Sequence, residues 1–203
     1  MTTAYKEACI IFRNHVEAFC KMTDADWELL VPHLEMKSLK KNQHFIREGK
    51  KETSIGFVIE GMLRQYYTKD GEEKTTYFFF ENHLISSYIS CITAKPSLIT
   101  IEALSNTTCI SFPYKIMLEL FDKSMAWQKF GRLIAEYLTI GLEERMVGLL
   151  LQSPEERYID LLNSNKKKIL ERVPQHYIAN YLGITPVSMS RIRNRLAGRV
   201  SHP

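Results

Sequence analysis

Arg191 and Arg195, with Ser188 before them, stand three and four residues apart near the C-terminus. This spacing places all three side chains on one stripe of a helix. A guanidinium group can bond to a guanine edge through two parallel hydrogen bonds or pair with a phosphate. The chemistry open to this stripe is therefore recognition of DNA from the major groove. The alternative is an ordinary helical hairpin whose arginines form a solvated face.

The residues around this stripe form a helix-turn-helix pattern that would position it. Ile178 and Leu182 make an apolar pair one turn apart, and Gly183 supplies the permissive backbone that a tight turn between helices needs. Thr185 is a candidate N-cap, and Pro186 stands at the first helical position, where its missing N–H costs nothing. The side chains expected to face inward from the second helix are Met189, Ile192 and Leu196.

Charge separates this region from the rest of the chain. From residue 165 onward eight basic residues stand against one acid, a net charge of +7, whereas the whole chain carries +4. A basic end on a mildly acidic body is typical of a phosphate-binding module. We expect Ser188 and Arg191 to contact bases and most of the others to contact phosphates. The residues predicted to contact DNA are Gln175, His176, Thr185, Val187, Ser188, Arg191, Arg193 and Arg195.

The composition is that of an ordinary globular protein, with 203 residues of which 45% are hydrophobic. No apolar run is long enough for a transmembrane helix, and no secretory signal pattern is present, so we expect a soluble, cytoplasmic protein without membrane partners. The cysteines Cys9, Cys20, Cys91 and Cys109 lack the spacing of a metal site. The sequence therefore predicts no catalytic residues, no metal and no cofactor.

The pattern of the chain predicts an α+β fold. Between residues 35 and 112, short β-rich runs alternate with turn residues, which favours a double-stranded β-helix, or jelly roll. Asp70-Gly71 is the strongest hairpin signal, between runs at 63–68 and 74–79. Ser153 and Glu156 make a capping-box pattern that opens a new domain. The predicted parts are a β-roll domain at 1–123, a long dimerisation helix at 124–152 and a helix-turn-helix domain at 153–203.

The long helix is expected to hold two subunits together. Its apolar residues repeat almost as heptads, and a second apolar stripe widens the face that must be covered. One side would pack on its own β-domain and the other on the same helix of a second copy. The alternative is the core helix of a monomer. The residues predicted at the dimer interface are Phe130, Leu133, Tyr137, Ile140 and Val147.

A β-roll, a long helix and a C-terminal helix-turn-helix, in this order, resemble the Crp/Fnr family of bacterial transcription regulators. The stretches FIREG at 45–49 and IGFVIEG at 55–61 are similar to the opening strands of the family's cyclic-nucleotide-binding-type roll. The pattern from Ile178 to Ile192 is similar to its helix-turn-helix. The resemblance implies a homodimer that binds double-stranded DNA at a pseudo-palindromic site and takes an input through the roll. RNA polymerase is a further candidate partner.

Two stretches depart from the relatives that bind cyclic AMP. Those relatives hold the ribose with a glutamate and the phosphate with an arginine and a serine, whereas the matching stretches here are Ser86–Tyr88 and Pro96–Leu98. A buried phosphate without its arginine lacks the charge-assisted bonds that offset its desolvation. We therefore do not expect cyclic AMP as the effector, whose identity stays open. The candidate pocket residues are Ser86, Ser87, Tyr88 and Ser97.

The reading helix and the C-terminus depart as well. Pro186 and Val187 replace the Arg-Glu pair of relatives that read the usual half-site, so we expect a different target, with Val187 near a thymine methyl group. The sequence stops at Pro203, where relatives continue into a β-hairpin wing, so the wing is expected to be truncated or absent. Two other functions stay open: a DNA-binding regulator without an effector, and a cupin-like metal protein or enzyme, for which the roll offers His44 and His83, far apart.

Overall fold

The computed structural model describes residues 2–163 and 167–200, which form two compact units. The first unit comprises residues 1–67 and 78–138, and the second comprises residues 68–77 and 139–203. The boundary falls inside the longest helix, α5 (Met125–Leu151), whereas the sequence-based division treats residues 124–152 as one segment. None of the helices in the described ranges combines the length and the apolar composition needed to cross a bilayer.

The β-roll consists of two four-stranded sheets, with the strand orders β1-β8-β3-β6 and β2-β7-β4-β5, and belongs to the first unit except for the hairpin tip at residues 68–77, which belongs to the second. Ile46, Val58, Leu63, Ile101 and Cys109 are buried in one core cluster that strands of both sheets supply. The predicted mixed fold with a β-roll and a long helix is thus confirmed. The strands are β1 (Glu35–Leu39), β2 (His44–Ile46), β3 (Ser54–Glu60), β4 (Leu63–Lys69), β5 (Glu72–Phe79), β6 (Leu84–Ile85), β7 (Thr100–Ala103) and β8 (Thr107–Pro113).

The β4–β5 hairpin closes as its sequence predicts. Asp70 and Gly71 have φ angles of 54° and 80°. Two successive residues with positive φ are the mark of a type I′ turn, whose twist matches that of the strands it joins. β5 is the last strand of its sheet among the described residues, so one of its edges faces away from the sheet.

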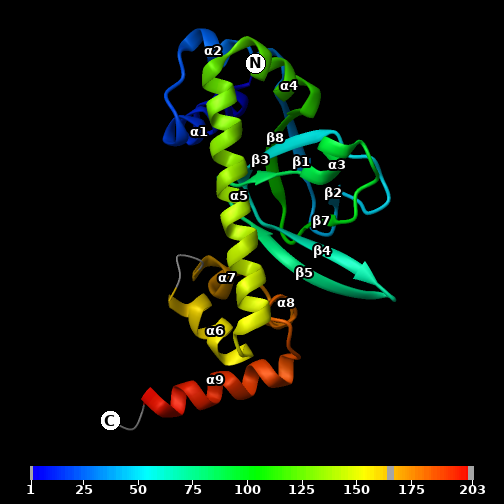
Figure 1. The fold of residues 1–203 in the computed structure, drawn as a ribbon, viewed down its shortest axis with the longest axis vertical. Helices are drawn as coiled ribbons and strands as arrows, with labels where there is room; N and C mark the ends of the chain where they lie inside the picture. The colour runs from blue at the N-terminus through cyan, green and yellow to red at the C-terminus, as the bar shows by residue number, and fades with distance from the viewer. Residues whose placement is uncertain (1, 164–166, 201–203) are drawn as a thin grey trace. The chain divides into compact units, whose positions relative to one another are not determined.

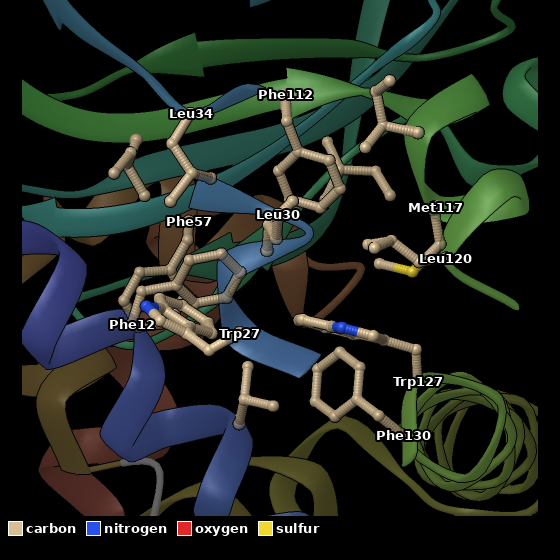
Figure 2. Packing of buried hydrophobic residues seen from close by; sticks show 14 of the residues in the cluster. Phe12, Trp27, Leu30, Leu34, Phe57, Phe112, Met117, Leu120, Trp127 and Phe130 are labelled. Carbon is tan, nitrogen blue, oxygen red and sulfur yellow. The ribbon is translucent and has the colours of Figure 1, made fainter. Parts of the chain in front are cut away.

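An aromatic cluster fixes the start of α5 to the roll. Phe12 of α1 stacks on Phe57 of β3 with ring centroids 4.6 Å apart, and Trp127 packs edge-on against Phe130 at 5.6 Å (Figure 2). The buried Trp127 indole also donates its N–H to the Asp26 carbonyl at 2.9 Å. Burying such side chains contributes roughly 1.5–3 kcal/mol each. The helices α1, α2 and α4 gather at this end of α5 (Figure 1). The remaining helices of the first unit are α1 (Thr3–Phe19), α2 (Asp24–Glu28), η1 (Val31–His33), α3 (Tyr88–Thr93) and α4 (Tyr114–Lys123).

The second unit contains the end of α5 and four further helices, coloured yellow to red in Figure 1. The predicted capping box opens α6, because the Ser153 hydroxyl accepts the Glu156 N–H at 3.3 Å and the Glu156 carboxylate accepts the Ser153 N–H at 2.7 Å. The last helix continues through residues 197–200, and residues 201–203, where the sequence ends without the wing of the relatives, lie outside the described residues. These helices are α6 (Pro154–Asn163), α7 (Lys167–Arg172), α8 (Gln175–Tyr181) and α9 (Pro186–Val200).

Candidate nucleic-acid interface

The turn between α8 and α9 rests on buried apolar side chains. Ile178 of α8, Leu182 at the end of α8, and Met189 and Ile192 of α9 are each at most 6% exposed. Gly183 takes a φ of +73°, in the left-handed region where a side chain would be strained. Two helices joined by a turn at Gly183 thus stand where the periodicity of the sequence places them. Burial of one face leaves the opposite face of α9 to carry its polar residues.

Thr185 fixes the start of α9. Its hydroxyl oxygen accepts the Ser188 N–H at 3.1 Å and lies 3.0 Å from the Ser188 hydroxyl oxygen. This is the N-cap that the sequence predicts. The Thr185 hydroxyl is therefore already bonded within the start of α9 and holds Ser188 in place.

The other predicted DNA-contacting side chains are reachable from solvent. Val187 is 61% exposed at the start of α9, and Arg191 and Arg193 are exposed further along it. Gln175 and His176 are exposed in the first turn of α8. The helix-turn-helix thus brings to one unit an apolar contact, hydrogen-bonding groups and cations, which are the three kinds of group that DNA recognition uses.

Arg195 is held by a residue that sequence reasoning missed. Its guanidinium lies 2.5 Å from the Glu155 carboxylate at the start of α6, and both side chains border a hollow of about 400 Å³ together with Ser188 and Arg191. An exposed pair of this kind contributes roughly 0.2–1 kcal/mol. Glu155 and Arg195 are forty residues apart in the sequence, so no local pattern could have indicated the pair. It lowers the net charge beside Arg191.

Two further arginines, also missed from the sequence, anchor the turn to the end of α5. Arg157 donates from Nε and Nη2 to the Leu182 carbonyl at 3.1 and 2.9 Å, and from Nη1 to the Gln152 carbonyl at 2.5 Å. Arg145 donates to the Tyr181 carbonyl and lies over the Tyr181 ring, 3.9 Å from its centroid. Burial lowers the pKa of Arg145, and the nearby Arg157 charge lowers it further. Both cations occupy the carbonyls at the C-terminus of α8, where positive charge is favoured.

The predicted dimer interface divides along α5. Phe130 is 1% exposed and belongs to the core of the first unit, where the Phe19 ring meets it edge-on at 5.9 Å, so it offers no surface to a second copy. Leu133 is half-buried against the same core. Tyr137, Ile140 and Val147 remain 43–59% exposed. Further exposed apolar residues of α5 are Leu138, Leu142, Met146, Leu149, Leu150 and Leu151. A row of this length is unusual on a monomer surface.

Two of the four predicted effector residues, Ser87 and Ser97, bond to each other. The buried Ser97 hydroxyl lies 2.9 Å from the Ser87 hydroxyl and 2.8 Å from the Ile99 carbonyl, and its oxygen accepts the Ile99 N–H at 3.1 Å. The Ser97 backbone pairs with Gly49 and Lys50, at 2.8 Å in each bond. Ser86 is half-buried, and Tyr88 is 36% exposed and packs edge-on against Tyr114 at 6.1 Å. The Ser97 hydroxyl thus satisfies backbone groups of Ile99, as serines in turns commonly do, and Ser87 bonds to Ser97.

The roll also buries one guanidinium that the sequence analysis did not single out. Arg64 of β4 is 3% exposed and donates from Nε and Nη2 to the Glu102 carboxylate on β7, at 3.0 and 2.9 Å. Its guanidinium carbon lies 4.2 Å from the centroid of the Tyr66 ring. Arg64 and Glu102 are register partners on neighbouring strands. This pair neutralises the cation in place.

Metal ligands do not converge in the part of the chain that the structure describes. No group of three or more His, Cys, Asp or Glu side chains lies close enough there to hold an ion. Cys9, Cys20, Cys91 and Cys109 are free thiols. Burial raises the pKa of Cys91 and of Cys109 to about 11 in each case, which disfavours the thiolate that a metal needs.

Comparison with known proteins identifies the roll. Residues 36–124 match the family model of the cyclic nucleotide-binding domain. Comparison with curated protein sequences found no match. The match covers the strands from β1 to β8, so it concerns the roll and not the helix-turn-helix.

Solved structures of regulators share the fold over most of the chain. FixK2 from Bradyrhizobium japonicum aligns with a TM-score of 0.68 and 17% identity, over 82% of this chain and 85% of that chain. A Crp/Fnr-family transcriptional regulator from Eubacterium rectale aligns with a TM-score of 0.68 and 20% identity, over 92% and 88%. The c-di-GMP responsive regulator CLP from Xanthomonas campestris gives 0.66 and 14%, over 87% and 93%. The predicted resemblance to the Crp/Fnr regulators is confirmed at the level of the fold.

Proposed function

We propose that this chain is a transcription regulator that binds double-stranded DNA as a homodimer, with α9 in the major groove. The observation that carries the proposal is the exposed arginine face of α9, on a helix that Thr185 caps and whose preceding turn Arg157 anchors. Groups that read DNA must be held to within a fraction of an ångström by rigid surroundings, and this helix has them.

Within this proposal the residues of α9 divide by role. Arg191 reads a guanine through its O6 and N7 atoms, with Ser188 beside it and Val187 against a thymine methyl group. Gln175, His176 and Arg193 bind phosphates, which set the position of the helix-turn-helix on the duplex without specifying sequence. Arg195 contributes to the phosphate contacts only after its pair with Glu155 opens or rearranges.

Dimerisation is supported by the apolar row on α5. Tyr137, Ile140 and Val147 repeat at intervals of three and seven residues and stay exposed, together with the leucines further along the helix. Two copies packed along this row would cover it and would be related by a two-fold axis. Two symmetry-related helix-turn-helix elements read two half-sites in opposite orientation, so the target would be a pseudo-palindrome.

Substituting Arg191 distinguishes base-specific recognition of DNA from non-specific electrostatic binding. We expect Arg191→Ala to weaken binding to a selected site by about 5- to 150-fold, because a bidentate guanine contact is worth roughly 1–3 kcal/mol. Arg193→Ala is the matched control, which should weaken specific and random DNA alike and reduce the salt slope by about one. Fluorescence anisotropy with both DNAs at several salt concentrations measures this. If Arg191→Ala lowers both affinities equally, Arg191 does not read bases.

The effector of this regulator is, in our proposal, not a cyclic mononucleotide. The Ser87 and Ser97 hydroxyls are bonded to each other, Ser97 is also bonded to the Ile99 backbone, and the buried Arg64 is paired with Glu102. A cyclic phosphate entering the roll would have to break these bonds. Calorimetry with cyclic AMP and cyclic GMP should show no binding in the micromolar range, and such binding to either would contradict the proposal.

Three predictions from the sequence remain predictions within this function. One is contact with RNA polymerase, another is a location in the cytoplasm, and the third, which the sequence leaves open, is whether an effector exists. Repeating DNA-affinity measurements with fractionated small molecules tests the third directly. The cupin-like alternative predicts a stoichiometric metal, which elemental analysis of purified protein would detect.

A further inference from the structure

Asn180 of α8 makes two hydrogen bonds to the backbone of β5, more than a hundred positions away in the sequence. Its Oδ1 accepts the Thr75 N–H at 2.6 Å, and its Nδ2 donates to the Glu73 carbonyl at 2.8 Å. All three residues belong to the second unit, which includes the hairpin tip at residues 68–77. We call this pair of bonds the Asn180 clasp.

The geometry of the clasp is that of one residue in an added parallel strand. In a parallel ladder, one residue donates its N–H to the carbonyl of residue i on the neighbouring strand and accepts the N–H of residue i+2. The carboxamide of Asn180 makes this pattern with Glu73 and Thr75. β5 is the last strand of its sheet in the described part of the chain, so the clasp fills positions that a further strand would fill.

The Thr75 side of the clasp is buried. Thr75 is 3% exposed, and its hydroxyl oxygen is buried without a hydrogen-bond partner. A β-hairpin edge that merely faced solvent would not hide a polar side chain at this cost. The bond to the Thr75 N–H is therefore partly shielded from water, whereas the bond to the Glu73 carbonyl is exposed.

We propose that Asn180 is a docking residue through which the DNA-binding helix pair holds the β4–β5 hairpin as an intramolecular ligand. Because β4 and β5 continue from this tip into the roll, the clasp is a second connection between the roll and α8, in addition to α5. It restricts the motion of the helix-turn-helix in the free protein, so that binding of two half-sites together costs less conformational entropy. This last step rests on the proposed DNA-binding function.

Hydrogen exchange of single backbone amides tests the clasp itself in the full chain. We expect the Thr75 amide to exchange on the order of tenfold faster in Asn180→Ala than in the wild type, since two neutral hydrogen bonds are lost. The Ile184 amide, which donates to the Ala179 carbonyl at 3.0 Å, should keep its protection and so report that the turn is intact. Matched controls are Thr75→Val, which keeps the backbone N–H, and Asn163→Ala, an exposed residue at the end of α6. An unchanged Thr75 rate in Asn180→Ala would overturn the clasp.

DNA affinity tests what the clasp does. Asn180→Ala should bind a full palindrome several-fold more weakly and an isolated half-site about equally, because only the full site requires both helix-turn-helix elements to be placed at once. Thr75→Pro removes the same N–H from the hairpin side, where an edge strand tolerates proline, and should reproduce this difference without altering α8. Unchanged or higher affinity of both variants for the palindrome would overturn the preorganising role. If the wild type binds no DNA, the proposed function fails, while the exchange rates still decide the clasp.

Discussion

Gly61 stands where β3 turns into β4 and approaches the chain between β7 and β8 very closely. Its φ is +104°, and a Cβ at this position would lie 2.5 Å from the Thr107 hydroxyl oxygen, 2.6 Å from the Asn106 carbonyl oxygen and 2.8 Å from the Thr107 Cα. Two of these neighbours are backbone atoms, which cannot rotate away. Replacing Gly61 by alanine therefore strains its own backbone and displaces a neighbouring segment.

The expected loss follows from these two effects. The left-handed conformation costs an L-residue roughly 1–2 kcal/mol, and forcing a methyl group into a packed site costs roughly 1–3 kcal/mol. Gly61→Ala should therefore lower the free energy of unfolding of the first unit by about 2–5 kcal/mol. Gly49 is the matched control, because its φ is +78° and no heavy atom lies within 4 Å of its Cβ position. Gly49→Ala should cost only about 1–2 kcal/mol.

Urea unfolding followed by tryptophan fluorescence measures this difference. The chain has two tryptophans, Trp27 and Trp127, and both are buried in the core of the first unit. Alanine also narrows the unfolded ensemble, which stabilises both variants by similar amounts and cancels in the comparison. Equal losses for Gly61→Ala and Gly49→Ala would refute the reasoning, since the close approach to Asn106 and Thr107 would then have no energetic weight.

Two further predictions concern pH and assembly. Burial against the Phe19 and Phe57 rings lowers the pKa of His15, so the unfolded chain binds a proton at this residue more readily than the folded chain does. The free energy of unfolding of the first unit should therefore fall as pH drops from about 6.5 toward the lowered pKa. His15→Leu should reduce this dependence on pH in urea titrations at pH 7, 6 and 5. Ile140 is 59% exposed in the row on α5, so Ile140→Glu should shift the protein from dimer to monomer in sedimentation at micromolar concentration, whereas Leu118→Glu, at a 47% exposed site on α4, should leave it a dimer. A wild type that sediments as a monomer would contradict the assembly prediction.

Features governed by a few neighbouring residues could be predicted from the sequence. The Asp70-Gly71 turn, the Ser153–Glu156 capping box and the Thr185 cap each depend on residues within three positions of one another, so their chemistry is visible in the sequence itself. The β-roll was predicted for a related reason, because short β-rich runs separated by turn residues have few compact solutions.

Contacts between distant segments could not be predicted in this way. Nothing in the local sequence pairs Glu155 with Arg195 or places Arg157 beneath the Leu182 carbonyl. In the sequence Asn180 is only an uncharged polar residue on α8, and its bond to the edge of β5 appears only in the structure. Because these residues act through geometry that the whole fold creates, residue type and spacing gave no signal for them.

The interface prediction failed at Phe130 for a different reason. Periodicity shows which residues of a helix are apolar, but it does not show which apolar stripe faces the chain's own core. The aromatic cluster takes Phe130 and part of Leu133, and the exposed row begins only at Tyr137. The heptad pattern thus runs from residues buried in the core of the first unit to residues exposed on the surface of the same helix.

Selection of bound DNA from a random pool tests the central claim most directly. We expect the wild type to enrich one pseudo-palindromic sequence and Arg191→Ala to lose the preferred bases in each half-site. Arg193→Ala should retain the wild-type sequence with weaker binding. Enrichment of no sequence by the wild type, or of the same sequence by Arg191→Ala, would contradict the assignment of α9 as a sequence-reading helix.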